Sequence, residues 1–280
     1  MSSYLDSNIK AARKWLANNE EGLDLYTQGL MLALSKKDRP SMMSVASHLR
    51  ALSVHHGTQA QVYCYDSDLD QGVVFSKSII YSYWSIKISI ECIMAGFGSQ
   101  EEKSTRLLHV IDLLCCTLAA VIAVNERYLS DELGEMLLRV YRFESLREVY
   151  FKKRPFESFM VWLYMMKKDP SQVSVDIQDS IFKTVSVEFA RVSVQGFFEL
   201  VDYHKAHSSD GNDQWRAEFI FSPFNVFVFE VVAFAKVVGT AALPNNELID
   251  FCLSACASFN AVSDEVSQKV EDAYNEVFIF

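Results

Sequence analysis

Histidines are the first side chains to test for metal binding or catalysis in this sequence. They are His48, His55, His56, His109, His204 and His207. Only two close pairs occur among them, at 55–56 and at 204 with 207. A zinc ion needs three or four converging ligands, and no Cys or Glu stands at a supporting spacing. We therefore predict no metal site, and expect His56, which falls on an apolar stripe, to be a hydrogen-bonded core histidine.

Three aspartates with alternating spacing, Asp66, Asp68 and Asp70, have the pattern of the first ligands of a calcium loop. Such a loop also needs Gly at its sixth position and Glu at its twelfth. Counted from Asp66, those positions hold Gln71 and Lys77. The three carboxylates are therefore predicted to form either a solvated turn or an acidic patch that binds a partner.

Motifs for enzyme chemistry are missing from the chain. The sequence has no GxGxxG or GxxxxGK[ST] to hold phosphates, no GxSxG to present a serine and no HExxH to hold zinc. The DxxxD spacing at 66–70 is too weak a signal for a terpenoid-type α-helical enzyme, and the Glu/His signature of a haem-oxygenase-like protein is absent. The basic run 152–154 is too short to predict nucleic-acid binding. We expect no cofactor and no catalysis, and favour a protein that binds another protein.

Composition favours a packed, helical protein. Hydrophobic residues make up 50% of the 280 residues and charged residues 22%, which excludes disorder. Only 10 Gly and 5 Pro are present, whereas all-β folds need many Gly and Pro turns. Apolar residues recur three to four apart, so we predict an all-α fold, an irregular bundle or stack of about 10 to 12 helices. The expected helices cover 6–17, 22–34, 41–64, 73–95, 99–125, a stretch from 130, 156–168, 177–204, 223–239, 245–259 and 263–277.

Two of these segments, 73–95 and 223–239, are rich in β-branched and aromatic residues and lean locally toward strand. The helical rhythm of 73–95 persists for about 20 residues, whereas strands usually have only about 5 or 6. Helix is therefore the prediction for both. The stretch 215–221 is left as a short strand or a helical turn.

The apolar runs 107–124 and 223–239 also raise the question of a membrane. The first contains His109 and Asp112, and the second contains Glu230 and Lys236. A spanning helix needs about 20 mostly uncharged residues, so both runs are interpreted as central helices of a soluble core. The beginning of the chain lacks the layout of a signal peptide, and the six cysteines form no disulfide framework, so we expect a cytoplasmic protein.

Glu230 is a lone carboxylate within an apolar run. Burying such a group without a partner costs several kcal/mol. We expect it to pair with Arg191 or Arg216 and to fix the register of its helix.

Charge is distributed unevenly along the chain. Residues 1–170 hold 20 basic and 20 acidic side chains, and residues 171–280 hold 6 and 16, so the net charge of −10 belongs to the last 110 residues. The break at 169–171 coincides with this change and is the one candidate for a subdomain hinge in an otherwise single helical domain, 1–280. An acidic surface repels nucleic acid and attracts a basic partner. Ordinary solubility is the alternative explanation of the charge.

An acidic helical chain with unpaired cysteines, no catalytic signature and the stretch FSPFNVFVFEVVAFAKVVG at 221–239 resembles the helical immunity proteins of bacterial polymorphic toxin and type VI secretion systems. Such proteins bind a cognate toxin, often a nuclease, and block its active site or the approach of its substrate. Since nuclease domains that hold DNA or RNA tend to be basic, the resemblance implies a basic partner protein. It does not imply binding to nucleic acid or membrane.

We expect partner binding at two acidic surfaces. The first surrounds the loop at 207–213 and consists of Glu199, Asp202, Asp210, Asp213 and Glu218, with Trp215 as an aromatic anchor. The second consists of Asp66, Asp68 and Asp70. The rival hypothesis is a helical scaffold or adaptor that binds a peptide or protein in a groove between helices.

Overall fold

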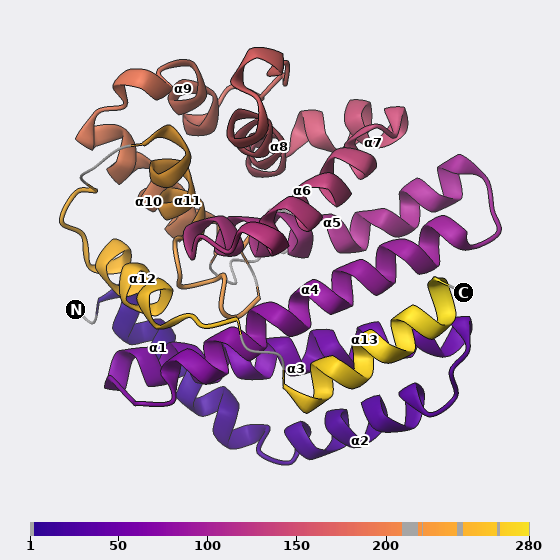
Figure 1. Ribbon diagram of the computed structural model, residues 1–280. Helices are drawn as coiled ribbons and strands as arrows, with labels where there is room; N and C mark the ends of the chain where they lie inside the picture. The colour runs from indigo at the N-terminus through magenta and orange to yellow at the C-terminus, as the bar shows by residue number, and fades with distance from the viewer. Residues whose placement is uncertain (1–2, 209–217, 220, 240–242, 262–263, 280) are drawn as a thin grey trace. The chain divides into compact units, whose positions relative to one another are not determined.

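The chain folds entirely into helices and connecting turns wherever the computed structural model describes it, which is at residues 3–208, 218–219, 221–239, 243–261 and 264–279. Thirteen α-helices and three short 3-10 helices occur in these ranges, and no strand does (Figure 1). The predicted all-α class is confirmed. The strand-leaning segment 73–95 is helical because its rhythm buries residues such as Phe75, Ile79 and Ile86 along one helix.

The α-helices of the first hundred residues are α1 (Tyr4–Asn18), α2 (Gly22–Leu34), α3 (Arg39–Asp66) and α4 (Gln71–Ala95). The next are α5 (Gln100–Ala123), α6 (Arg127–Tyr141), α7 (Glu144–Val149), α8 (Pro155–Lys168) and α9 (Ile181–Val187). The last are α10 (Val194–His207), α11 (Phe229–Val238), α12 (Glu247–Ser258) and α13 (Glu265–Phe278). The 3-10 helices are η1 (Phe151–Lys153), η2 (Pro170–Gln172) and η3 (Phe189–Arg191).

Two compact units divide the chain. The first contains Met1–Gly98, Phe221–Pro223 and Ser254–Phe280, and the second contains Ser99–Ile220 and Phe224–Leu253. The break predicted at 169–171 lies inside the second unit, directly after α8. Its role as a hinge remains a prediction.

In the first unit, α3 and α4 pack along one another, α1 and α2 pack on α3, and α13 packs on α4 (Figure 1). Small polar side chains join the two central helices. The hydroxyl of Ser53 donates to the carbonyl of Ser78 at 2.9 Å, and the hydroxyl of Ser78 donates to the carbonyl of Ser53 at 2.8 Å. These reciprocal bonds satisfy buried hydroxyls and let the helix backbones approach closely.

In the second unit, α5 is the central helix and contacts α6, α7, α8 and α11. It begins within one residue of the predicted start at 99, and a capping box fixes this start: the hydroxyl of Ser99 accepts the amide of Glu102, and the Glu102 carboxylate accepts the amide of Ser99. In the described part of the chain, α5 is the one helix long and apolar enough to cross a membrane, and 72% of its most apolar window is buried inside the protein.

Two helix predictions need correction. The segment 177–204 is not one helix, because α9 ends at Val187 and α10 begins only at Val194. The hydroxyl of Ser193 accepts the amide of Gly196 at 3.2 Å, so the chain restarts a helix there with its own N-cap. The segment 223–239 is helical only from Phe229. In 215–221, the described residues 218, 219 and 221 form neither helix nor strand.

Candidate functional site

The three aspartates at 66–70 lie in the turn that joins α3 to α4. α3 ends at Asp66, and Ser67 follows in the left-handed region with φ of 56°. All three carboxylates are exposed, as predicted. The guanidinium of Arg13 donates to Asp66 at 2.5 Å, and the carboxylate of Asp68 accepts the amide of Asp70 at 2.8 Å. We call residues 66–70 the acidic turn.

A hydrophobic side chain stands in the middle of the acidic turn. Leu69 is 99% exposed and Val73, one helical turn further, is 56% exposed. Isolated exposed hydrophobic residues are common on protein surfaces, but these two border a groove of about 370 Å³. The groove is lined by Leu69, Gly72, Val73, Ser76, Lys77, Ser258, Asn260 and Asp264. Leu69 was not among the predicted site residues, although a leucine between aspartates in a predicted turn is a signal for an exposed anchor.

Backbone contacts fix the walls of this groove. A Cβ at Gly72 would lie 2.3 Å from the carbonyl oxygen of Ser258, so only glycine lets the start of α4 approach the end of α12. The amide of Asn260 donates to the hydroxyl of Ser76 at 3.0 Å. The hydroxyl of Tyr81 donates to Asp264 at 2.6 Å, and Lys77 lies 3.7 Å from the same carboxylate. The groove is therefore preformed, which lowers the entropic cost of binding.

Two residues of the first predicted surface are exposed, and its role in partner binding stays a prediction. Glu199 and Asp202 are exposed on α10, where Glu199 accepts a bond from Gln195 at 3.2 Å and Asp202 accepts one from Lys205 at 3.3 Å. The predicted residues Asp210, Asp213 and Trp215 lie outside the described residues.

Glu218 does not belong to an exposed surface, and that prediction is wrong. It is 4% exposed, and its carboxylate accepts a hydrogen bond from the hydroxyl of Tyr203 at 2.8 Å. The amides of Glu218 and Phe219 donate to the carbonyl of His207 at 3.0 and 3.3 Å. These bonds join His207 and Glu218, the two residues that flank 208–217, beside the end of α10. They therefore hold Glu218 in the core.

A buried polar cluster of the second unit surrounds Glu157 on α8. Its carboxylate oxygen Oε1 accepts from the Nε of Arg154 at 2.8 Å and lies 3.2 Å from the hydroxyl of Tyr150. Tyr150 donates to Asp112 of α5, and Arg154 also reaches Asp112 at 3.5 Å. We call Asp112, Tyr150, Arg154, Glu157 and Glu218 the carboxylate cluster.

One guanidinium faces three carboxylates here, and two of these, Glu157 and Glu218, are buried. Burial raises the pKa of Glu157 to about 7, an effect that Arg154 opposes and Asp112 reinforces. Burial, together with the charge of Glu157, raises the pKa of Glu218 well above its ordinary value. The second oxygen of Glu157 is buried without a hydrogen-bond partner in the described structure. Burial therefore favours the protonated forms of both Glu157 and Glu218.

Glu230 is paired, but not with the predicted arginines. Its carboxylate lies 2.8 Å from the Nδ1 of His204, and both side chains are buried. The reason is the packing of α10 against α11, which places the two residues opposite each other. Arg191 is exposed, and Arg216 lies outside the described residues. The predicted buried pair therefore exists with a histidine as partner. His56 also follows its prediction, since it is buried and its Nδ1 lies 3.0 Å from the side-chain oxygen of Gln59.

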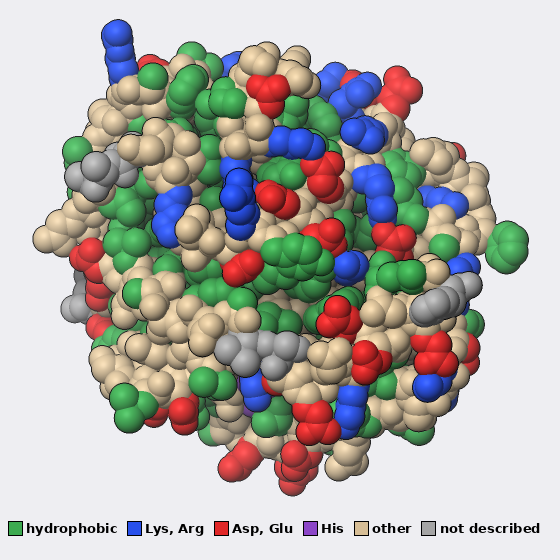
Figure 2. Space-filling view, in the orientation of Figure 1, with side chains coloured by type: hydrophobic (Ala, Val, Ile, Leu, Met, Phe, Trp, Pro, Cys, Tyr) green, Lys and Arg blue, Asp and Glu red, His purple; other side chains and the backbone are tan. Residues whose placement is uncertain are grey.

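Charge on the visible face of the molecule is mixed, since Asp and Glu lie interspersed with Lys and Arg around patches of hydrophobic side chains (Figure 2). Within the described ranges, no group of three or more His, Cys, Asp or Glu could hold a metal ion. Comparison of the chain with protein families, with curated proteins and with solved structures found no match.

Proposed function

We propose that this protein binds and neutralises a basic toxin, of the nuclease type, as the helical immunity proteins do. The observation that supports this proposal is the acidic turn, where a fully exposed leucine projects among three carboxylates beside a preformed groove. Binding sites of this kind combine a central apolar anchor with a charged rim.

The charges around the acidic turn favour a basic partner. Arg13 neutralises one carboxylate, at Asp66, so Asp68 and Asp70 remain to act on a partner. Asp6 adds a further carboxylate near the acidic turn. It is held there because it accepts a hydrogen bond at 2.7 Å from the hydroxyl of Tyr65, the residue before Asp66. Opposite charge increases the association rate, whereas a buried leucine slows dissociation. The proposal thus assigns different kinetic roles to the aspartates and to Leu69.

The test begins with capture of the partner from the native cells on immobilised protein, followed by identification and purification of the captured protein. Association and dissociation are then measured at low and moderate salt. We expect Asp68→Lys with Asp70→Lys to slow association by about tenfold or more at low salt and to weaken its salt dependence. We expect Leu69→Ala to accelerate dissociation by about tenfold, since a buried leucine contributes about 1.5–3 kcal/mol.

A matched control reverses two exposed acidic residues on α13, Glu271→Lys with Asp272→Lys, which changes the formal charge equally. This variant should bind like the wild type. A second variant, Glu199→Lys with Asp202→Lys, tests the surface on α10. If only that variant weakens binding, the partner contacts α10 and the acidic turn is the wrong surface. An acidic partner, or one without toxic activity, would contradict the immunity function itself.

A further inference from the structure

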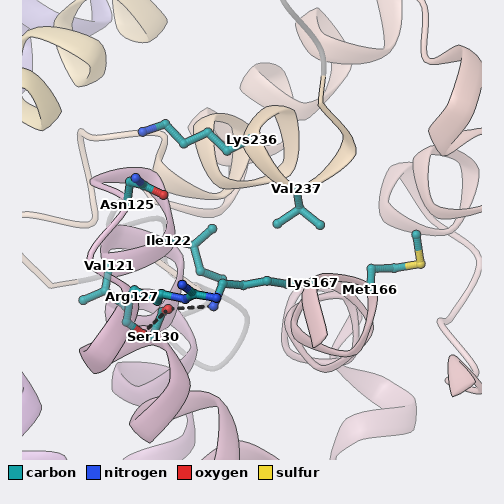
Figure 3. A pocket seen from close by; sticks show the side chains of 9 residues that line it. All are labelled: Val121, Ile122, Asn125, Arg127, Ser130, Met166, Lys167, Lys236 and Val237. Atoms are coloured by element: carbon teal, nitrogen blue, oxygen red, sulfur yellow. Dashed lines mark hydrogen bonds between the residues drawn. The ribbon is translucent and has the colours of Figure 1, made fainter. Parts of the chain in front are cut away.

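A pocket of about 420 Å³ in the second unit gathers basic side chains from three helices. Its lining residues are Val121, Ile122, Asn125, Arg127, Ser130, Met166, Lys167, Lys236 and Val237. They come from the end of α5 and the turn after it, the start of α6, and the last turns of α8 and α11 (Figure 3). The proposed partner surface does not involve this pocket.

Three cations line this pocket, and one of them is paired with a carboxylate. Lys167 is held in place, because its ammonium donates to the hydroxyl of Ser130 at 2.9 Å and to Asp131 at 2.7 Å. Figure 3 shows Lys167 reaching across from α8 to Ser130, near Arg127, while Lys236 extends from α11 toward the side of Asn125. Neither Arg127 nor Lys236 forms an ion pair with a described residue. Asp131 therefore offsets the charge of Lys167, and Arg127 and Lys236 are the two lining cations without such a partner among the described residues.

Backbone carbonyls beside the pocket already accept hydrogen bonds from amides. The carbonyls of Ala120, Val121 and Ile122 at the end of α5 accept the amides of Val124, Glu126 and Asn125. Helix C-termini favour nearby cations by about 0.3–1 kcal/mol, which explains why lysines occur in the last turns of α8 and α11. The charge at helix C-termini does not, however, explain why both lysines line the same pocket as Arg127 and Asn125.

Apart from the three cations, the lining consists of two polar residues, Asn125 and Ser130, and four apolar ones. Ile122 and Val121 are buried on α5, and Met166 and Val237 are partly buried on α8 and α11. Ligand sites commonly combine such apolar walls with a few polar groups, in volumes of about 300–1,000 Å³. The ligand must therefore carry both a strong negative charge and an apolar portion.

We propose that this pocket binds a small organic phosphate, with the phosphate at Arg127, Lys167 and Lys236 and the apolar portion against Ile122, Met166 and Val237. A phosphate monoester carries about −1.5 to −2 charges at pH 7 and three acceptor oxygens, which matches the unpaired cations. Arginine offers a two-pronged donor for such an oxygen pair. A carboxylate carries a single negative charge and would therefore balance less of the positive charge in the pocket.

Calorimetry on the 280-residue protein tests the proposal with four probes. Phenyl phosphate should bind more tightly than inorganic phosphate, which lacks the apolar ring, and more tightly than benzoate, which has half the charge. Phenol, which has no charge, should show no binding. Equal affinity of phenyl phosphate and phenol, or no binding of phenyl phosphate at millimolar concentration, would overturn the proposal.

Variants locate the site. Lys236→Gln and Arg127→Gln should each weaken phenyl phosphate binding by about tenfold or more, as expected for loss of a charge-assisted bond. Both residues are exposed, so the variants should keep the wild-type helical circular dichroism. The control is Lys168→Gln, the neighbouring lysine on α8, whose ammonium pairs with Glu135 and does not line the pocket. If Lys168→Gln weakens binding as much as the other two, the ligand is attracted by general charge and the assigned site is wrong.

Discussion

Glu157 shows how a single side chain links burial to pH. Its side chain is fully buried, and burial raises its pKa from 4.5 to about 7 despite the neighbouring Arg154. The folded protein therefore holds a proton that the unfolded chain releases between these two values. The contribution of Glu157 to stability is fully present below about pH 4.5 and is lost as the pH rises through about 7.

We therefore expect Glu157→Gln to remove one component of the pH dependence of stability. Urea unfolding from pH 5 to pH 8 should show that the stability difference between variant and wild type changes by about 2 to 3 kcal/mol across this range. The wild type should lose stability relative to the variant as the pH rises. Taking the difference cancels other titrations, such as that of His56, whose burial lowers its pKa to about 4. Parallel curves for the two proteins would show that Glu157 does not titrate in this range.

At the scale of elements, the contact between α6 and α8 depends on the absence of a side chain. A Cβ at Gly134 of α6 would lie 2.0 Å from the ring of Tyr164 on α8. The ring cannot easily move away, because the Tyr164 hydroxyl lies 3.0 Å from the carboxylate of Glu135 and 3.3 Å from the carbonyl of Asp131. Close helix contact here requires glycine.

Gly134→Ala should consequently destabilise the protein by about 1–3 kcal/mol through overpacking. In an exposed helix the same change would be stabilising by up to about 1 kcal/mol, since alanine is the better helix former. Gly22→Ala on α2 provides the control, because the nearest atom to its added Cβ is 3.5 Å away, in ordinary contact. Thermal unfolding should show changes in stability, relative to the wild type, that are opposite in sign or clearly different in size for the two variants. A stabilised Gly134→Ala would show that α6 and α8 do not pack as described.

At the scale of the whole molecule, the six cysteines report on the integrity of both units. All six are free thiols; five are buried and only Cys256 is partly exposed. Burial raises the pKa of Cys64 to about 12 and that of Cys92 to about 11, and it also raises the pKa of Cys115 and Cys116 well above the ordinary value of a thiol.

Ellman's reagent should therefore modify at most one thiol rapidly in the native protein, and all six after unfolding in denaturant. Cys256→Ser should remove the rapid reaction and leave the number of slow thiols unchanged at five. Rapid reaction of several thiols in the native protein would mean that the helices do not enclose them as described.

The amino-acid sequence alone determined the helical class, because the spacing of apolar residues, the scarcity of Gly and Pro and local caps such as Ser99 act within a few neighbouring residues. It also located the acidic turn, since three aspartates between two apolar helices belong on the surface. Which side chains pair with one another in the core depends on which helices pack together. Only the tertiary structure paired Glu230 with His204 and buried Glu218 against Tyr203, and it alone joined Arg127, Lys167 and Lys236 around one pocket. Such contacts join residues far apart in the chain, where burial and packing rather than local propensity decide which side chains meet.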